Sequence, residues 1–251
     1  MRQPQLVRSA AGEIGIQTDP QARAQGVLVG FTNRRGGVSS APYDSLNLAA
    51  RVGDEEHAVH ANRRRAADAV GFDHSRLVLA RQVHEAHVIE VGGADAGVLG
   101  EGDGLLTRDR GPVLSILTAD CAPVVVAGDA GVAVLHAGWR GIVAGVVEKG
   151  VAALGGGRAA WIGPCIHACC YEVGPEVIAA FEAHDLPIAD DRHVDPARAA
   201  ETALRRSGVD AVAVSDDCTH CNPDYFSYRR DGVTGRQGAF AALVEPGAAR
   251  R

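Results

Sequence analysis

Two segments decide the fold, Thr118-Ala119-Asp120-Cys121-Ala122-Pro123 and Val132-Ala133-Val134-Leu135-His136-Ala137-Gly138-Trp139-Arg140-Gly141. Each is built on an apolar run that ends at a reactive side chain. Residues 114–117 lead to Cys121, and residues 132–135 lead to His136. Residues 124–126 continue the first run, and the turn-forming residues 128–131 follow, which predicts a β-hairpin. We therefore expect Cys121 and His136 on neighbouring strands.

Cys121 and His136 have two chemical interpretations. A thiol beside an imidazole can be a nucleophile with its base, or the two can be ligands of one metal ion. Cysteine and histidine also occur as plain core residues. Because Asp120 and Arg140 lie beside them, where the apolar runs stop, we interpret the group as a cleft at the end of a sheet. Its catalytic candidates are Cys121, His136 and Asp120.

The composition excludes several classes of protein. Apolar residues make up 46% of the chain and charged residues 22%, as in ordinary soluble globular proteins. The net charge of −6 lacks the basic excess of a nucleic-acid binder. No apolar run is long enough for a membrane span, and residues 1–5 do not resemble a signal peptide, so we expect a cytoplasmic protein. Six cysteines in 251 residues predict thiols or metal ligands rather than a disulfide scaffold.

Strand-like and helix-like segments are mixed along the chain, which predicts one α/β domain with mixed sheets between helices. Residues 1–25 are mixed and polar and are expected to be loosely held, with a single catalytic domain over residues 26–245. Strands are expected at 27–31, 76–83, 88–91, 159–162 and 209–214. Helices are expected at 141–154, 175–184, 195–207 and 54–70, the last with Asp54 as N-cap and Gly71 at its end. Residues 92–104 read as a loop, and residues 237–244 as a last helix or strand.

Arg34 and Arg35 precede a Gly36-Gly37 turn. Backbone N–H groups of such a turn, together with fixed positive charge, suit an anion such as phosphate. The alternative is a plain glycine turn with solvated arginines.

Three strong metal ligands stand at the ends of apolar runs: His84, Cys121 and His136. Two imidazoles and a thiolate suit zinc, and three protein ligands leave a fourth position open, as in catalytic zinc sites. A zinc-bound water loses a proton near neutral pH. The rival interpretation is a metal-free dyad of Cys121 and His136, with His84 incidental.

A second group of possible ligands lies towards the C-terminus. Cys218-Thr219-His220-Cys221 has the two-residue gap of a zinc knuckle. A structural zinc and a set of free thiols near the cleft both remain open, since two of the thiols are adjacent and geometrically awkward. The members of this group are Cys165, Cys169, Cys170, Cys218, His220 and Cys221.

The sequence resembles the YfiH family of multicopper-polyphenol-oxidase-like, laccase-domain proteins, from about residue 31 to residue 242. The resemblance is carried by many motifs in the same order along the chain. They are Arg34-Arg35-Gly36-Gly37-Val38-Ser39, Ser45-Leu46-Asn47-Leu48, Gly53-Asp54, Asn62-Arg63, Gln82-Val83-His84, Asp103-Gly104, Ala119-Asp120-Cys121-Ala122-Pro123, His136-Ala137-Gly138-Trp139-Arg140-Gly141, Ile162-Gly163-Pro164-Cys165-Ile166, Tyr171-Glu172-Val173 and Phe226-Ser227-Tyr228-Arg229-Arg230.

The resemblance implies a single α/β domain, related in fold to the deamidase domain of cytotoxic necrotising factors. It implies zinc held by His84, Cys121 and His136. It also implies purine nucleoside phosphorylase activity on adenosine, inosine and methylthioadenosine with phosphate, beside adenosine deamination. Under this interpretation we expect a monomer whose substrate- and phosphate-binding residues are Arg34, Arg35, Asn47, Gln82 and Arg140. Cys169, Cys170 and Cys221 inherit no role from the family pattern.

The laccase in the family's name is not what the residues favour. A multicopper oxidase holds several coppers with many histidines, commonly in His-x-His pairs, and this chain has none. Copper is then expected only as an opportunistic occupant in place of zinc. Two further hypotheses remain: a Cys121 hydrolase or amidase that edits peptidoglycan precursors, and a zinc-stabilised binding module without turnover.

Overall fold

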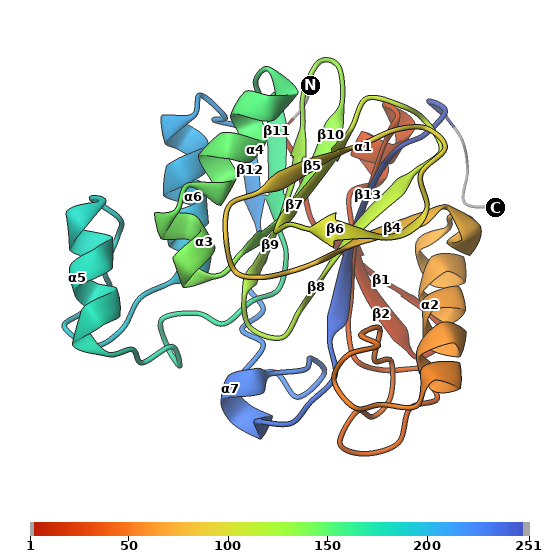
Figure 1. Cartoon of the computed structure of the whole chain (residues 1–251), viewed down its shortest axis with the longest axis horizontal. Coiled ribbons are helices and arrows are strands. Elements are labelled where there is room, and N and C mark those ends of the chain that lie inside the picture. The colour runs from red at the N-terminus through yellow and green to blue at the C-terminus, as the bar shows by residue number, and fades with distance from the viewer. Residues whose placement is uncertain (1–2, 248–251) are drawn as a thin grey trace.

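The computed structural model of the chain describes residues 3–247, in which the strands form two sheets (Figure 1). The larger sheet has the order β1 (Val7–Ala11), β2 (Ile14–Thr18), β3 (Val27–Thr32), β13 (Gln237–Leu243), β8 (Val113–Thr118), β4 (Leu77–Arg81) and β6 (Gly97–Glu101). The smaller sheet has the order β12 (Val212–Val214), β11 (Ala159–Ile162), β9 (Ala122–Ala127), β10 (Val132–Ala137), β7 (Gly104–Thr107) and β5 (Val88–Val91). Both sheets mix parallel and antiparallel pairs.

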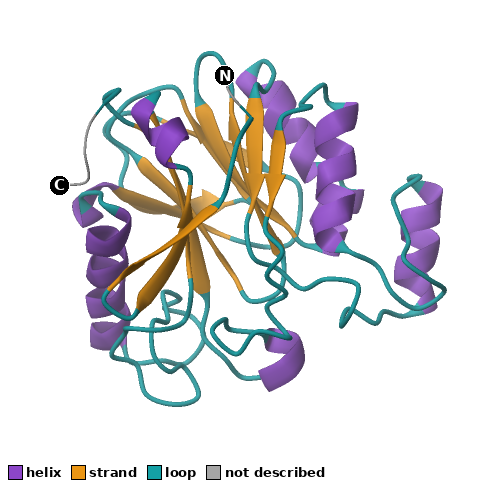
Figure 2. Ribbon diagram, turned by 180° about the vertical axis from the view of Figure 1, so that it is seen from behind, coloured by secondary structure: helices purple, strands orange, loops and turns teal. Residues whose placement is uncertain are grey.

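The two sheets pack face to face between layers of helices (Figures 1 and 2). One helix, α2 (Glu56–Val70), covers the outer face of the larger sheet. The outer face of the smaller sheet is covered by α3 (Trp139–Val143), α4 (Val146–Leu154) and α6 (Pro196–Arg206). The remaining helices are α1 (Pro20–Ala24), α5 (Pro175–Ala183), α7 (Tyr228–Asp231) and the 3-10 turn η1 (His74–Arg76). The predicted class, a single α/β domain with mixed sheets between helices, is confirmed.

Alternation of side chains along each central strand builds this layered core. In β9, Val124 and Val126 face the helices, whereas Val125 and Ala127 face the other sheet. All these side chains are fully buried. Successive residues of a strand point to opposite faces, so a strand covered on both sides reads as a continuous apolar run. This explains why β9 carries no polar residues.

The expected hairpin is confirmed for its second half only. β9 pairs antiparallel with β10, with Pro123 opposite His136. The run at 114–117, however, belongs to β8 in the other sheet, so it does not continue into β9. The chain crosses between the sheets through residues 119–121, where Asp120 has a φ of 100°. This crossing places Cys121 where the two sheets diverge.

Several expected element boundaries are wrong for local reasons. The helix expected at 141–154 is two helices, because Gly145 adopts a left-handed conformation between α3 and α4. Asp54 is not the N-cap of α2: its carboxylate accepts from Ser39 Oγ, Asn47 Nδ2 and the N–H of Glu55. The expected loop 92–104 contains the short strand β6. The last element, left open between helix and strand, is strand β13.

The N-terminal segment, expected to be loosely held, contributes β1, β2 and α1, and β2 pairs with β3. Asp19 links this segment to the smaller sheet. Its buried carboxylate caps α1 through the N–H groups of Gln21 and Ala22 and accepts from the indole Nε1 of Trp161 at 2.9 Å. Alternating hydropathy is weak here because β1 lies at the sheet edge and is largely exposed. None of the helices in residues 3–247 is long and apolar enough to cross a membrane.

Replacing Trp161 with Phe tests this attachment. The substitution leaves the buried Asp19 carboxylate without its indole donor, which we expect to lower the free energy of unfolding by about 1–3 kcal/mol. Urea denaturation followed by circular dichroism measures the loss. Trp139→Phe, at a half-exposed position, is the matched control, with a change below about 0.5 kcal/mol. Equal losses in the two variants would contradict the role of Asp19.

Candidate active site with a metal-ligand set

A cavity of about 610 Å³ opens where the end of β4, the crossing between the sheets, the end of β10 and the start of α3 meet. Its wall includes five of the predicted site residues: Gln82, His84, Asp120, Cys121 and His136. Arg140, a sixth predicted site residue, also lines it. The apolar part of the wall is made by Leu79, Ala80, Val98 and Leu117, and its aromatic part by Trp139, Tyr171 and Tyr228.

The three predicted metal ligands meet in this wall. The donor atoms of His84, Cys121 and His136 all lie within 4.8 Å of one another. Cys121 Sγ is 3.9 Å from His84 Nε2, and the two imidazole rings are edge to face with centroids 4.7 Å apart. His84 is exposed, Cys121 is half-buried and His136 is buried, so the set opens to the cavity on one side. Three donors with an open side suit a metal ion that also contacts substrate.

Asp103 holds two of these ligands in place. Its fully buried carboxylate lies 2.7 Å from His136 Nδ1. The same carboxylate accepts the backbone N–H groups of Val83, His84 and Glu85. These bonds fix a turn in which His84 has a left-handed φ of 63°. A carboxylate behind a histidine sets its ring orientation and leaves Nε2 for the metal.

The residues present therefore fit a metal ion such as zinc: two imidazoles, one thiolate and a carboxylate behind one imidazole. Asp103 was not among the candidate site residues predicted from the sequence. The signal that could have revealed it is the Asp-Gly pair before an apolar run, in a segment otherwise assigned to a loop.

The charges of Cys121 and His136 stabilise each other. Burial alone would raise the pKa of Cys121, but the neighbouring charge of His136 and hydrogen bonds from His136 and His84 outweigh it and lower the pKa to about 6. Burial alone would lower the pKa of His136, but Cys121 and Asp103 raise it to about 9. Without metal, the pair is a thiolate beside an imidazolium, the charge state of a cysteine nucleophile.

Asp120 lines the cavity, yet both of its carboxylate oxygens are engaged. Oδ1 accepts from Thr219 Oγ1 at 2.6 Å, and Oδ2 accepts from the backbone N–H of Arg229 at 2.7 Å. Its own carbonyl accepts from Ile166. These bonds join the sheet crossing to three later segments, so the geometry gives Asp120 a positioning role beside Cys121.

Gln82 and Asn47 also bond mainly to the backbone. Gln82 donates to the carbonyl of Leu117 and accepts its N–H, which extends the pairing of β4 with β8. Asn47 is buried and does not line the cavity. It bonds to Ala49 and accepts the N–H of Arg236, so it positions two segments that do line the cavity.

The structure does not bring Arg34 and Arg35 to the cavity. Arg34 pairs with Asp44 at 3.2 Å and Asp231 at 3.6 Å, and Arg35 pairs with Asp224 at 2.9 Å. The N–H groups of Gly37 and Val38 already donate to Ser45 and Asn62. These two N–H groups are therefore not available to bind phosphate.

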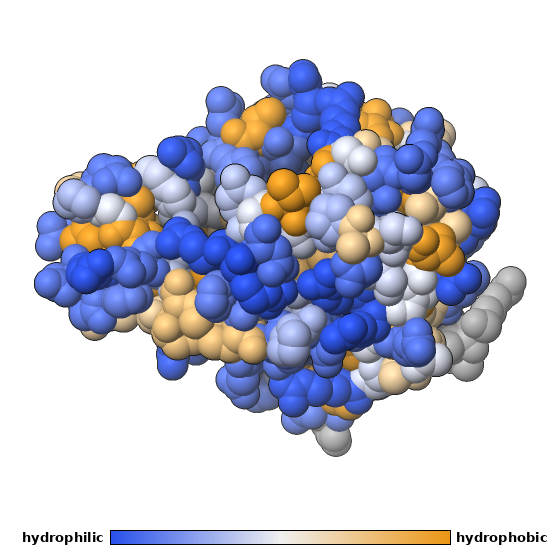
Figure 3. All heavy atoms as spheres, turned by 90° about the horizontal axis from the view of Figure 1, so that it is seen from below, coloured by the Kyte–Doolittle hydropathy of each residue, from blue (hydrophilic) through white to orange (hydrophobic). Residues whose placement is uncertain are grey.

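The cavity has other arginines instead. Its wall contains one carboxylate, that of Asp120, against six guanidinium groups: Arg51, Arg63, Arg81, Arg140, Arg229 and Arg236. Arg81 pairs with Glu101, and Arg63 donates to a backbone carbonyl. Within residues 3–247, no ion pair engages Arg140, Arg229 or Arg236. The face seen in Figure 3 is mostly hydrophilic, with the most hydrophilic side chains gathered across its middle.

Two of these arginines border a second hollow of about 500 Å³, which shares Trp139, Arg140, Tyr171 and Arg229 with the main cavity. The Arg229 guanidinium lies over the Tyr171 ring, 5.0 Å from its centroid. Burial is the main cause that raises the pKa of Tyr171 to about 12, although both arginines act against it. Tyr171 therefore remains a phenol at neutral pH. Arg140 was among the phosphate-binding residues predicted from the sequence. Tyr171 and Arg229 stood in the sequence motifs, but nothing in their spacing assigned them a role.

Comparisons with known proteins show the family to which the chain belongs. Residues 28–244 match the family described as multi-copper polyphenol oxidoreductase laccase. The chain belongs to this family, as the sequence motifs predicted. Its relatives include the proteins named YfiH.

The similarity covers most of each relative. The chain is 41% identical to the purine nucleoside phosphorylase SCO2081 of Streptomyces coelicolor, over 87% of this chain and 96% of that one. It is 38% identical to the purine nucleoside phosphorylase YfiH of Escherichia coli, over 88% and 95%. Among solved structures it is similar to YlmD from Geobacillus stearothermophilus, with a TM-score of 0.87, 30% identity and coverage of 96% and 100%.

The substitution Asp103→Asn tests the support of the ligand set. The amide places an N–H₂ group against donors that need an acceptor, so we expect metal affinity to fall about 10–100-fold while the fold is kept. Zinc competition with a chromophoric chelator measures the affinity. The amount of zinc that Cys121→Ala binds under the same conditions is subtracted to isolate this site. Asp95→Asn changes a carboxylate that accepts the N–H of Gly92 and does not line the cavity, so it should keep the affinity of the unmodified protein. A normal affinity in Asp103→Asn would show that the carboxylate does not position the ligands.

The lowered pKa of Cys121 predicts how its alkylation depends on pH. Because the thiolate is the reactive form, the rate in metal-free protein should be half-maximal near pH 6 and constant above about pH 7. Peptide mass spectrometry after iodoacetamide treatment separates Cys121 from the other thiols. In His136→Gln the midpoint should move towards the ordinary thiol value of about 8.5. A midpoint near that value in the unmodified protein would contradict the ion pair.

Proposed function

We propose that the chain is a zinc-dependent purine nucleoside phosphorylase that cleaves adenosine, inosine and methylthioadenosine with phosphate. The observation that carries the proposal is a cavity in which a His84, Cys121 and His136 ligand set faces arginines without carboxylate partners among the described residues. The names of the relatives support a phosphorylase of this kind. Phosphate needs the positive charge, and a nucleoside needs the apolar and aromatic wall beside it.

Arg140, Arg229 and Arg236 are the groups that we assign to phosphate. Guanidinium groups bind phosphate oxygens with paired, charge-assisted hydrogen bonds. Burial lowers the pKa of Arg236, with the nearby Cys121 and Asp120 acting in the opposite sense, so its charge is held close to the ligand set. Arg140 and Arg229 lie where the two hollows join. Phosphate held there would approach the ribose C1′ carbon from the arginine side.

The apolar wall positions the nucleoside. Leu79, Val98 and Leu117 can cover the base, and the aromatic rings of Trp139 and Tyr171 border the phosphate side. The protonated Tyr171 hydroxyl can donate a hydrogen bond to substrate at neutral pH. A zinc ion held by His84, Cys121 and His136 would supply positive charge that stabilises the leaving base. With the same ligands, deamination at the purine C6 carbon would be a side activity.

A second candidate is a cysteine hydrolase or amidase acting on peptidoglycan precursors. The arrangement of Cys121, His136 and Asp103 favours it. A thiol with a lowered pKa lies beside an imidazole, and a carboxylate orients that imidazole, as in a catalytic triad. This candidate predicts that alkylation of Cys121 abolishes activity and that a chelator leaves it intact. A copper polyphenol oxidase would need several coppers, and residues 3–247 contain a single histidine-bearing ligand group.

The test is release of hypoxanthine from inosine by protein of measured metal content. We expect release that requires phosphate, disappears after zinc is removed and returns when zinc is restored. Cys121→Ala should lose both the activity and the zinc held by His84, Cys121 and His136. If zinc-loaded protein releases no base with or without phosphate, the proposal fails and the amidase becomes the better candidate.

The arginine assignment is tested by Arg140→Gln. Loss of a charged hydrogen bond worth about 1.5–3 kcal/mol should raise KM for phosphate by about tenfold or more, with little change in kcat. Arg35→Gln is the matched control, since Arg35 lies outside the cavity and pairs with Asp224. An increase in KM for phosphate in Arg35→Gln and none in Arg140→Gln would instead move phosphate to the turn at residues 34–37.

A further inference from the structure

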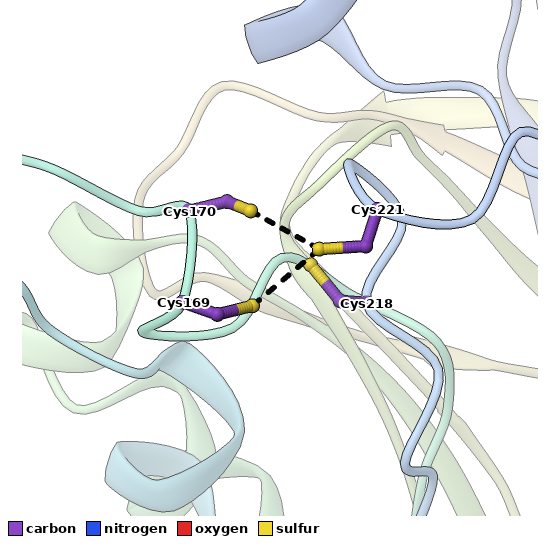
Figure 4. Close-up of side chains that lie close together, drawn as sticks. All are labelled: Cys169, Cys170, Cys218 and Cys221. Atoms are coloured by element: carbon purple, nitrogen blue, oxygen red, sulfur yellow. Dashed lines mark hydrogen bonds between the residues drawn. The ribbon is translucent and has the colours of Figure 1, made fainter.

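Four cysteines from two separate loops gather outside the cavity just described. Cys169 and Cys170 follow β11, whereas Cys218 and Cys221 follow β12 (Figure 4). All four sulfur atoms lie within 4.8 Å of one another. The Sγ atom of Cys221 is 3.1 Å from that of Cys170 and 3.6 Å from that of Cys169. None of them lines the cavity.

The topology of the smaller sheet explains how they meet. β11 and β12 are parallel neighbours, so both loops leave the sheet at the same edge. The loops continue side by side. The backbones of Cys165 and Cys218 form an isolated parallel β-bridge, and the N–H of Thr219 donates to the Cys165 carbonyl at 2.9 Å. The adjacent thiols of Cys169 and Cys170, which the sequence suggested would be awkward ligands, both point towards Cys221 (Figure 4).

Cys218-Thr219-His220-Cys221 also has the hydrogen bonds of a metal-binding knuckle. The N–H of Asn222 donates to the Cys218 carbonyl at 2.9 Å and closes a tight turn. Backbone N–H groups of His167, Cys221 and His220 donate to the Cys218 sulfur. Backbone donors around a sulfur orient it and suit a metal-bound thiolate.

The sulfur–sulfur distances distinguish between a zinc site, a disulfide and an iron–sulfur cluster. Zinc bound to four thiolates at about 2.3 Å places neighbouring sulfur atoms about 3.8 Å apart, close to the separations here. A disulfide would need about 2.05 Å. Sulfur ligands within 4.8 Å of one another leave room for one ion rather than a cluster of several irons. We propose that Cys169, Cys170, Cys218 and Cys221 form a second metal site, which binds one zinc ion as a tetrathiolate.

Such an ion would have no open position, so its role is structural. It would tie together two loops that support the cavity wall. Thr219, inside the knuckle, donates to Asp120 at 2.6 Å, and Tyr171, which follows Cys170, lines the cavity. The second site would thus hold Asp120 and Tyr171 in place without touching substrate.

The test uses the full chain purified under reducing conditions with zinc. Mass spectrometry of metals should give two equivalents for the unmodified protein and one for Cys121→Ala, in which the second site is the only one expected to remain. Cobalt added to metal-free Cys121→Ala should give the intense charge-transfer and visible bands of tetrahedral tetrathiolate coordination. In Cys121→Ala combined with Cys169→Ser and Cys221→Ser, both the metal and the bands should be lost.

Cys165→Ala is the matched control in the Cys121→Ala background, because Cys165 is a buried cysteine beside the cluster but outside the group of four. It should keep its equivalent of zinc and its cobalt spectrum. The proposal is overturned if folded Cys121→Ala binds no metal or gives cobalt bands without thiolate character. It is also overturned if the intact mass shows a disulfide under reducing conditions. These readouts on Cys121→Ala need no substitution in the cluster itself.

Discussion

The candidate active site depends on the buried carboxylate of Asp103. This group accepts four hydrogen bonds, from the His136 ring and from the N–H groups of residues 83–85. It thereby joins the end of β10, in the smaller sheet, to the turn after β4, in the larger sheet. A buried anion without such partners would cost several kcal/mol, so the carboxylate and the turn depend on each other. His84 and His136 come from different sheets, and Asp103 holds them in one geometry.

The crossing between the sheets brings the third ligand to the same place. β8 ends in the larger sheet and β9 begins in the smaller one, so residues 119–121 lie where the sheets diverge. Asp120 fixes this crossing through Thr219 and the backbone of Arg229. Both partners belong to the C-terminal part of the chain, which also supplies arginines to the cavity wall. The cysteine cluster is linked to this wall through Thr219, which lies between Cys218 and Cys221 and donates to Asp120.

Much of this architecture could be predicted from local sequence. Apolar runs closed by turn residues gave β9 with β10, and β11, because buried central strands have little choice of structure. Gly71 and Asp195 marked helix ends as expected. His84, Cys121 and His136 were recognised because their side chains are chemically distinctive and stand at strand ends. The YfiH-like motifs strengthened both predictions.

Other features depend on contacts that the sequence does not display. The run from β8 to β9 reads as one strand, and only tertiary packing divides it between two sheets. Arg34 and Arg229 look equally suited to phosphate, yet Arg34 is neutralised by Asp44 and Asp231, while Arg229 faces the cavity. Asp103 lies in a glycine- and acid-rich segment, where only the Asp-Gly pair before an apolar run distinguishes it from the other acidic residues. Charge pairing and burial are set by the fold, so these roles emerge only in three dimensions.

The most direct test of the central claim is zinc-edge X-ray absorption on Cys169→Ser/Cys221→Ser protein, in which the cysteine cluster is disabled. We expect one zinc per chain, with two imidazole nitrogens at about 2.0–2.1 Å and a single sulfur at about 2.3 Å. The substitution Cys121→Ser in the same protein should remove the sulfur signal. A first shell made of sulfur alone, or a folded protein that holds no zinc, would contradict the assignment of His84, Cys121 and His136 as the metal centre.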